Sequence, residues 1–288
     1  MGRRNRIWRL GLRWVRGSAS RSKTPDGDRD GTASRFGPTD RPPPSSRQSR
    51  TGEPINWRRV ALLVSSGLII VFVVVEIRVG LESNGWGNAL GLDYGIYMEA
   101  VHRWLSGGGF YLDRQLHGPY EIAIGDVLYP PTAIWFLLPF AFLPWPIWWI
   151  GSLGLLVWLV WTWRPAFWSL PLLVACIAFP PSVLDVMAGN PGLWIAGFVG
   201  LGLRFGWPGA LVLLKPSVFP FALPGISTRG WWLTVAVLAV LTMPLLPMVP
   251  DWIHTVLDGR GFGGWLYSLK DVGLLLLPVI AWKARRNA

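Results

Sequence analysis

Apolar residues form long runs in this chain, and polar residues gather before the first run and between the first and second. The first run extends from Val60 to Val79, and the later ones occupy residues 132–163, 166–184, 191–205, 207–225, 231–249 and 271–282. A helix of about twenty apolar residues crosses the hydrocarbon core of a bilayer. The pattern therefore predicts an all-α, polytopic integral membrane protein with about six to eight transmembrane helices.

Two of these runs leave the number of spans open. The run 132–163 is long and contains Pro144 and Pro146, so it forms either one span or two short helices that turn there. The run 207–225 forms either one span or a re-entrant hairpin broken at Lys215–Pro216. Two combinations of these alternatives place both Arg229 and Lys283 in the cytoplasm. In the first, residues 132–163 form two spans and residues 207–225 form one. In the second, residues 132–163 form one span and residues 207–225 form the hairpin.

Composition and charge agree with a membrane protein. Hydrophobic residues make up 51% of the chain and charged residues only 15%, whereas soluble domains carry about 25% charged residues. The net charge is +11, but residues 1–59 alone hold fifteen Lys and Arg against five acids. The excess is therefore a topology signal that predicts a cytoplasmic N-terminus, and we expect no nucleic-acid partner.

The same pattern divides the chain into two parts. Residues 1–57 are rich in Arg, Ser, Gly and Pro without hydrophobic periodicity, which predicts a disordered basic cytoplasmic tail. Residues 58–288 are expected to form the transmembrane module, with a polar loop outside the membrane at about 80–131.

Most candidate chemistry lies in this loop. A helix is predicted from Asp93 to Ser106, where three glycines end it, and Asp93, Tyr97 and Trp104 share one face of it. Asp93 has two interpretations. It is either the N-cap of the helix or a general base that accepts the proton of a hydroxyl group attacking an activated sugar.

Five short motifs resemble a known family when their order and spacing are taken together. They are Asp93-x-x-x-Tyr97, Gly108-Gly109-Phe110-Tyr111, Tyr129-Pro130-Pro131, Gly189-Asn190 and Lys215-Pro216. Over about residues 59–226 the chain resembles the polyprenol-phosphate-mannose-dependent mannosyltransferases, glycosyltransferase family 87 of the GT-C superfamily.

The resemblance implies an inverting transfer of a hexose, mannose in the first instance, outside the cell membrane. The donor would be a polyprenyl-phosphate sugar, the acceptor a hydroxyl of a cell-envelope glycolipid or polysaccharide, and Asp93 the base. No cofactor or metal is expected, since the sequence lacks an Asp-x-Asp pair suited to a metal-bound nucleotide sugar and a Gly-rich phosphate loop. The candidate substrate contacts are Tyr97, Trp104, Tyr111, Tyr129, Asn190 and Lys215.

Two alternatives stand beside this interpretation. Lys215 either contacts the donor phosphate or is a topology-setting lysine at the membrane interface. The chain also departs from the family, because Pro191 follows Asn190 without the family's Gln beside Gly189. Family members continue through further spans, so we expect a shortened member. The alternative function is a catalytically inactive or transporter-like membrane protein that supports envelope assembly.

Overall fold

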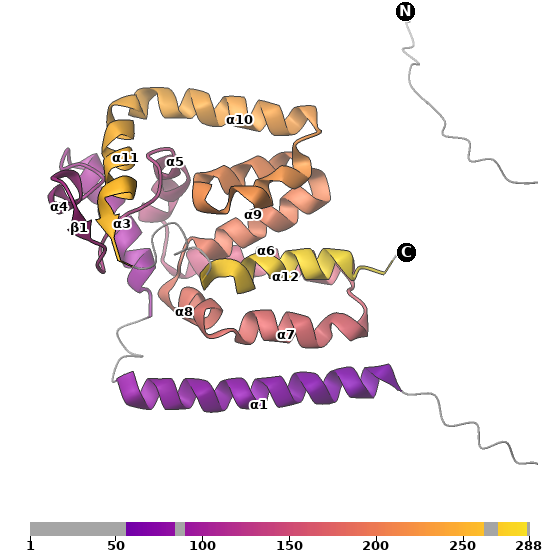
Figure 1. Ribbon diagram of the computed structural model, residues 1–288. Helices are drawn as coiled ribbons and strands as arrows, with labels where there is room; N and C mark the ends of the chain where they lie inside the picture. Colours follow the sequence, from indigo (N-terminus) through magenta and orange to yellow (C-terminus); the bar gives the residue numbers. More distant parts are fainter. Residues whose placement is uncertain (1–55, 84–89, 262–269, 287–288) are drawn as a thin grey trace, which may run out of the picture. The chain divides into compact units, whose positions relative to one another are not determined.

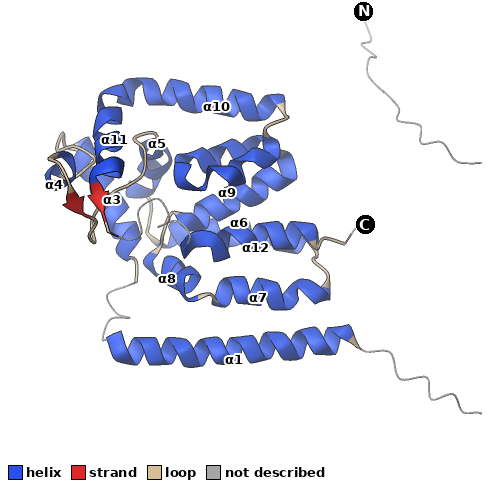
Figure 2. Cartoon of the chain, in the orientation of Figure 1, coloured by secondary structure: helices blue, strands red, loops and turns tan. Residues whose placement is uncertain are grey.

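Helices account for most of the chain that the structure describes, a computed structural model covering residues 56–83, 90–261 and 270–286 (Figures 1 and 2). Residues 1–55, and with them nearly all of the predicted tail, lie outside this range. The elements in chain order are α1 (Trp57–Ser83), α3 (Leu92–Leu105), α4 (Asp113–Leu116), β1 (Tyr120–Glu121), α5 (Ala133–Leu137), η1 (Leu138–Ala141), α6 (Pro146–Trp163), η2 (Phe167–Ser169), α7 (Leu170–Ala178), α8 (Pro180–Ala188), α9 (Gly192–Phe205), η3 (Trp207–Leu214), η4 (Pro216–Gly225), α10 (Arg229–Thr242), η5 (Met243–Met248), α11 (Val249–Asp258), β2 (Gly259–Arg260) and α12 (Val272–Lys283).

The predicted helical class is confirmed, and proline explains where the helices stop. α1 covers the first apolar run, and α3 begins and ends within one residue of the predicted loop helix. The run 132–163 divides as the proline pattern suggested, into the short α5–η1 segment and α6, whose first residue is Pro146. Proline is tolerated in the first turn of a helix because that position needs no N–H donor.

α9 lies at the centre of the packed helices, in contact with α6, α12, η3 and η4. Its glycines allow this close packing. A Cβ atom added at Gly200 would lie 2.5 Å from the side chain of Leu159 in α6, and one at Gly202 would lie 2.7 Å from the backbone of Gly209 in η3. Small residues at such positions bring helix backbones together, as they do between membrane helices.

The run 207–225 forms a hairpin of two short helices. η3 and η4 pack against each other and are separated at Lys215, whose backbone (φ −126°, ψ 83°) is not helical. Of the two alternatives for this run, the structure therefore has the one with a break at Lys215–Pro216. The indole N–H of Trp231 donates to the carbonyl of Ala222 at 2.8 Å, which fixes the start of α10 against η4.

Two described helical segments are long and apolar enough to cross a membrane, Pro146–Trp163 and Arg229–Asp258. A third is added if Phe167–Ala178 and Pro180–Ala188, which meet at a 59° bend, count as one span. Length and composition thus indicate a membrane-associated protein. The bend follows Phe179, where Pro180 and Pro181 begin α8.

The two ends of the helical layer carry different groups (Figure 1). At one end, Arg58 and Arg286 lie over the ring of Phe167 at 5.0 and 4.9 Å, and Ala166 donates its N–H to Ala284. The beginning of α1, the α6–α7 connection and the end of α12 therefore meet there. We call it the basic end. The polar loop, α3, α4 and α11 lie at the opposite end, which we call the site end.

α11 is held against the polar loop at the site end. Tyr120 and Glu121 pair in parallel with Gly259 and Arg260, forming the only strand pair among the described residues and a small departure from a purely α-helical fold. The hydroxyl of Tyr120 donates to the carbonyl of Thr255 at 2.8 Å. A segment late in the chain thus closes over the loop.

Candidate functional site

Asp93 lies in the first turn of α3 at the site end. Gly91 occupies the N-cap position with φ 73°, and its N–H donates to the carbonyl of Met187 at 2.8 Å, tying α3 to α8. No side chain caps this helix. The capping interpretation of Asp93 is therefore wrong, because a glycine in the left-handed conformation takes the position that the acid would need.

Asn190 holds the Asp93 carboxylate instead. The Asn190 side-chain N–H donates to one Asp93 oxygen at 2.5 Å, while the Asn190 side-chain oxygen accepts the backbone N–H of Gly192 at 2.7 Å. The second bond fixes which side of the amide faces Asp93, since only the NH₂ group is a donor. Two residues 97 positions apart are thereby joined at the start of two helices.

Tryptophans of α6 support the turn that presents Asn190. The buried indole of Trp148 donates to the carbonyl of Gly189 at 2.9 Å, and that of Trp149 donates to the carbonyl of Val186 at 2.7 Å. Gly189 has φ 69°, and a Cβ atom there would lie 2.6 Å from the Trp149 ring. Only glycine fits this position without a shift of its neighbours.

Lys215 is buried at the break of the η3–η4 hairpin and forms an ion pair with Asp271, the residue before α12. The Lys215 and Asp271 side chains are only 4% and 1% exposed. The Lys215 ammonium also lies 5.6 Å from the centre of the Tyr129 ring. A lysine that is buried and paired in this way differs from the solvated interfacial lysine that was the alternative interpretation.

A second ion pair lies beside the first. Lys270 and Asp185 approach to 3.6 Å, with Asp185 buried in α8 and Lys270 43% exposed. Our interpretation of the sequence assigned no role to Lys270 or Asp271. The sequence signal that could have identified them is that a lysine and an aspartate stand side by side directly before the last apolar run.

A cavity of about 170 Å³, which we call the polar cavity for the charged and polar side chains in its lining, brings these groups together. Its lining includes Asp93, Tyr97, Tyr129, Asn190, Lys215 and Lys270. Five of these are sequence-predicted site residues, and they come from α3, the polar loop, the turn before α9 and the hairpin. The ring of Tyr97 meets that of Tyr129 edge to face at 5.2 Å between centres.

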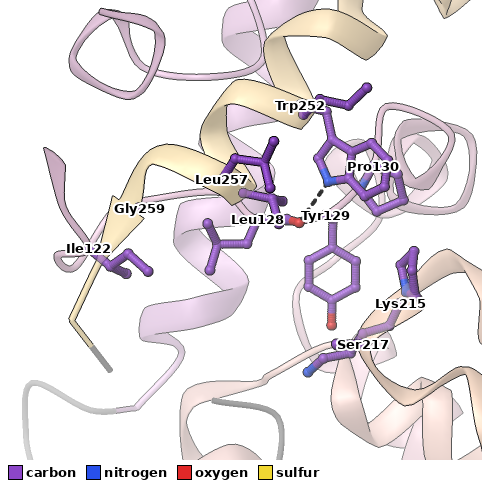
Figure 3. Close-up of a pocket in the computed structure, with 12 residues that line it drawn as sticks. Ile122, Leu128, Tyr129, Pro130, Lys215, Ser217, Trp252, Leu257 and Gly259 are labelled. Carbon is purple, nitrogen blue, oxygen red and sulfur yellow. Dashed lines mark hydrogen bonds between the residues drawn. The ribbon is translucent and has the colours of Figure 1, made fainter. Parts of the chain in front are cut away.

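A larger and mainly apolar cavity of about 290 Å³ (Figure 3) shares lining residues with the polar one and adjoins it. Leu128, Trp252 and Leu257 contribute to its walls, and the Trp252 indole donates to the carbonyl of Leu128 at 3.1 Å (Figure 3). Tyr129 and Lys215 line both cavities. The boundary between polar and apolar space therefore carries one aromatic ring and one cation.

Two predicted substrate contacts lie elsewhere. Trp104 packs edge to face on Trp135 of α5, 6.2 Å between ring centres. Tyr111 is buried and donates its hydroxyl to the Tyr129 carbonyl at 2.8 Å; burial, and secondarily the charge of Asp251, raises the pKa of this hydroxyl. Neither residue lines the two cavities. Tyr111 instead fixes the backbone of a residue that does.

The described residues contain no group of three or more His, Cys, Asp or Glu side chains placed to hold a metal ion. No protein-family model, curated protein or solved structure matches the chain. A functional proposal therefore rests on the groups that meet in the polar cavity.

Proposed function

We propose that the protein is a membrane glycosyltransferase of the GT-C type, which moves a hexose from a polyprenyl-phosphate donor to an acceptor hydroxyl of the cell envelope. One observation carries the proposal. Asp93, Asn190 and Lys215, which lie far apart in the sequence, line one polar cavity that adjoins an apolar one. A carboxylate, a cation and an apolar compartment side by side suit a substrate with a sugar, a phosphate and a hydrocarbon chain.

Asp93 is the proposed general base. The acceptor oxygen bonds to the anomeric carbon of the sugar while its proton passes to the carboxylate. The bond from that carbon to the phosphate oxygen breaks, and polyprenyl phosphate leaves with the bonding electrons. The hydrogen bond from Asn190 occupies one Asp93 oxygen and orients the group. The other oxygen takes the proton.

Lys215 is the proposed phosphate contact. An ammonium group has three N–H donors, so an ion pair with Asp271 is compatible with a further bond to a phosphate oxygen. The charge would stabilise the phosphate as the leaving group accumulates negative charge. Lys270 lines the same cavity and adds a second cation. The hydrocarbon chain would occupy the apolar cavity beyond Tyr129.

The proposed topology has six spans, with the η3–η4 hairpin entering and leaving on one side. The spans are α1, α6, α7–α8, α9, α10–η5 and α12. This arrangement is supported by the basic residues at one set of helix ends, since Arg164 follows α6 and Arg229 begins α10. The positive-inside rule then places the basic end in the cytoplasm and the cavities outside.

The buried Lys215–Asp271 pair also favours a second candidate, a transporter-like protein. Ionisable residues buried among membrane helices also mark substrate and ion pathways in transporters. Uptake of labelled sugar phosphate into vesicles, without formation of a glycosidic bond, would support this alternative.

The test of the glycosyltransferase is transfer of labelled mannose from polyprenyl-phosphate-mannose in membranes that contain the full chain and their own acceptors. We expect Asp93→Asn to reduce transfer by roughly 10²–10⁴-fold, the usual contribution of a general base. Asp113→Asn, which alters an exposed loop acid, is the matched control and should transfer at the wild-type rate. Transfer that survives Asp93→Asn removes Asp93 as base, and a wild type that transfers from no polyprenyl-phosphate hexose removes the enzyme.

A further inference from the structure

α11 turns away from α10 at a cluster of prolines. Figure 1 shows α10 running along the helical layer and α11 crossing its end at a steep angle. Pro244 and Pro247 lie in η5, between the two helices, and Pro250 is the second residue of α11. Each proline removes a backbone donor and disfavours a continuous α-helix, so the chain bends here.

The two faces of α11 have different surroundings. Trp252 and Thr255 face the polar loop, to which they are hydrogen-bonded through the Leu128 carbonyl and the Tyr120 hydroxyl. Ile253 and Leu257, one turn apart on another face, are 45% and 64% exposed. Both also line the apolar cavity, so they form its rim.

The exposed apolar surface continues from α10 onto α11. Val237, Val240 and Leu246 are all exposed, and residues 229–258 form one of the two segments apolar enough to cross a membrane. α11 itself has ten residues, so at 1.5 Å per residue it is about 15 Å long, half of the hydrocarbon thickness. A helix this short with an apolar face and a bend at its start lies along a bilayer surface.

We propose that α11 is an interfacial helix, with Ile253 and Leu257 inserted into the acyl region of the leaflet next to the polar loop. The partner of this surface is the lipid bilayer itself. Because the same two residues form the rim of the apolar cavity, the cavity opens sideways to the membrane. The inference does not depend on glycosyl transfer and holds equally for a protein that only binds or moves a lipid.

Site-directed spin labelling tests the proposal on the full chain. Cys176 is the only cysteine in the sequence and is buried, so Cys176→Ser gives a background for single labels at Ile253→Cys and Leu257→Cys. Val157→Cys in α6, exposed on a candidate span, is the reference for lipid, and Glu121→Cys in β1 is the reference for water. Collision rates with oxygen, which concentrates in lipid, and with a water-soluble nickel chelate are measured in phospholipid nanodiscs.

Labels at 253 and 257 should collide with oxygen several times more often, relative to the nickel chelate, than the label at 121. Their ratio should approach that of the label at 157. A ratio equal to that at 121 places α11 in water and overturns the proposal. Labels shielded from both reagents also overturn it, because a protein partner or a second copy then covers the face.

Discussion

Charged residues are used in opposite ways at the two ends of the helical layer. At the basic end, cations rest on aromatic faces: Arg204 lies 4.9 Å from the Trp158 ring and Arg285 lies 4.2 Å from the Trp282 ring. These contacts leave the charged group in reach of water and contribute about 0.5–1 kcal/mol each. We therefore expect many substitutions there to be tolerated.

At the site end, Lys215, Asp271 and Asp185 are buried and paired with opposite charges. Lys215 meets Asp271, and Asp185 meets Lys270. A buried ion pair adds little net stability, yet removal of one partner leaves a buried charge whose desolvation is no longer compensated. The comparison indicates that the site end requires each charged side chain to keep its partner, whereas the basic end requires only that cations are present.

The largest expected effect separates the two ends directly. Asp271→Ala leaves Lys215 buried without its Asp271 partner and should lower the free energy of unfolding by about 3–5 kcal/mol. Arg285→Ala at the basic end should cost less than about 1 kcal/mol. Unfolding of both variants in detergent by denaturant titration measures the contrast. The double variant Lys215→Met/Asp271→Leu should recover much of the loss, and equal costs at the two ends would contradict the comparison.

A smaller effect is expected at the turn that carries Asn190. Gly189→Ala requires a left-handed backbone at alanine, which costs about 1–2 kcal/mol, and a Cβ atom close to the Trp149 ring adds to this. Gly154→Ala in α6 is the control, since a Cβ atom there meets nothing within 4 Å. Thermal unfolding monitored by tryptophan fluorescence should show a lower midpoint for the first variant only. An unchanged midpoint would mean that the turn adjusts freely.

The smallest effect concerns the hydroxyl of Tyr111. Tyr111→Phe removes one hydrogen bond to the Tyr129 carbonyl and should cost about 1 kcal/mol at neutral pH. The pKa of Tyr111 is raised in the folded protein, so above the ordinary tyrosine pKa of about 10 the unfolded chain loses its proton first. Wild-type stability should therefore fall more steeply than that of the variant as the pH rises above 10, when followed by denaturant unfolding. Parallel curves would show that Tyr111 does not contribute.

The sequence predicted the helices and their breaks better than their contacts. Proline positions located the division of residues 132–163 and the break at Lys215, because the missing donor and the fixed φ of proline act locally. The predicted helix face of Asp93, Tyr97 and Trp104 identified two residues that line the polar cavity and one, Trp104, that does not. α5 covers the last turns of α3, so Trp104 packs on Trp135 while Asp93 and Tyr97 reach the cavity.

Contacts between distant segments could not be predicted from the sequence pattern. Nothing near Lys215 indicates that Asp271, 56 residues later, is its partner. The packing of α11 over the loop depends likewise on a pairing between residues 120–121 and 259–260. Hydrophobic periodicity describes which face of an element is covered, but it does not identify the segment that covers it.

The Lys215–Asp271 pair has a consequence for the order in which the molecule is made. At about 5–20 residues per second, a ribosome adds the 56 residues between them in roughly 3–11 s. In the proposed topology, the hairpin enters the membrane during that interval without the acid that later pairs with its lysine. Until Asp271 and α12 have been synthesised, Lys215 therefore needs water, a lipid headgroup or the insertion machinery beside it. The Lys215–Asp271 pair is thus a late step in the assembly of the site.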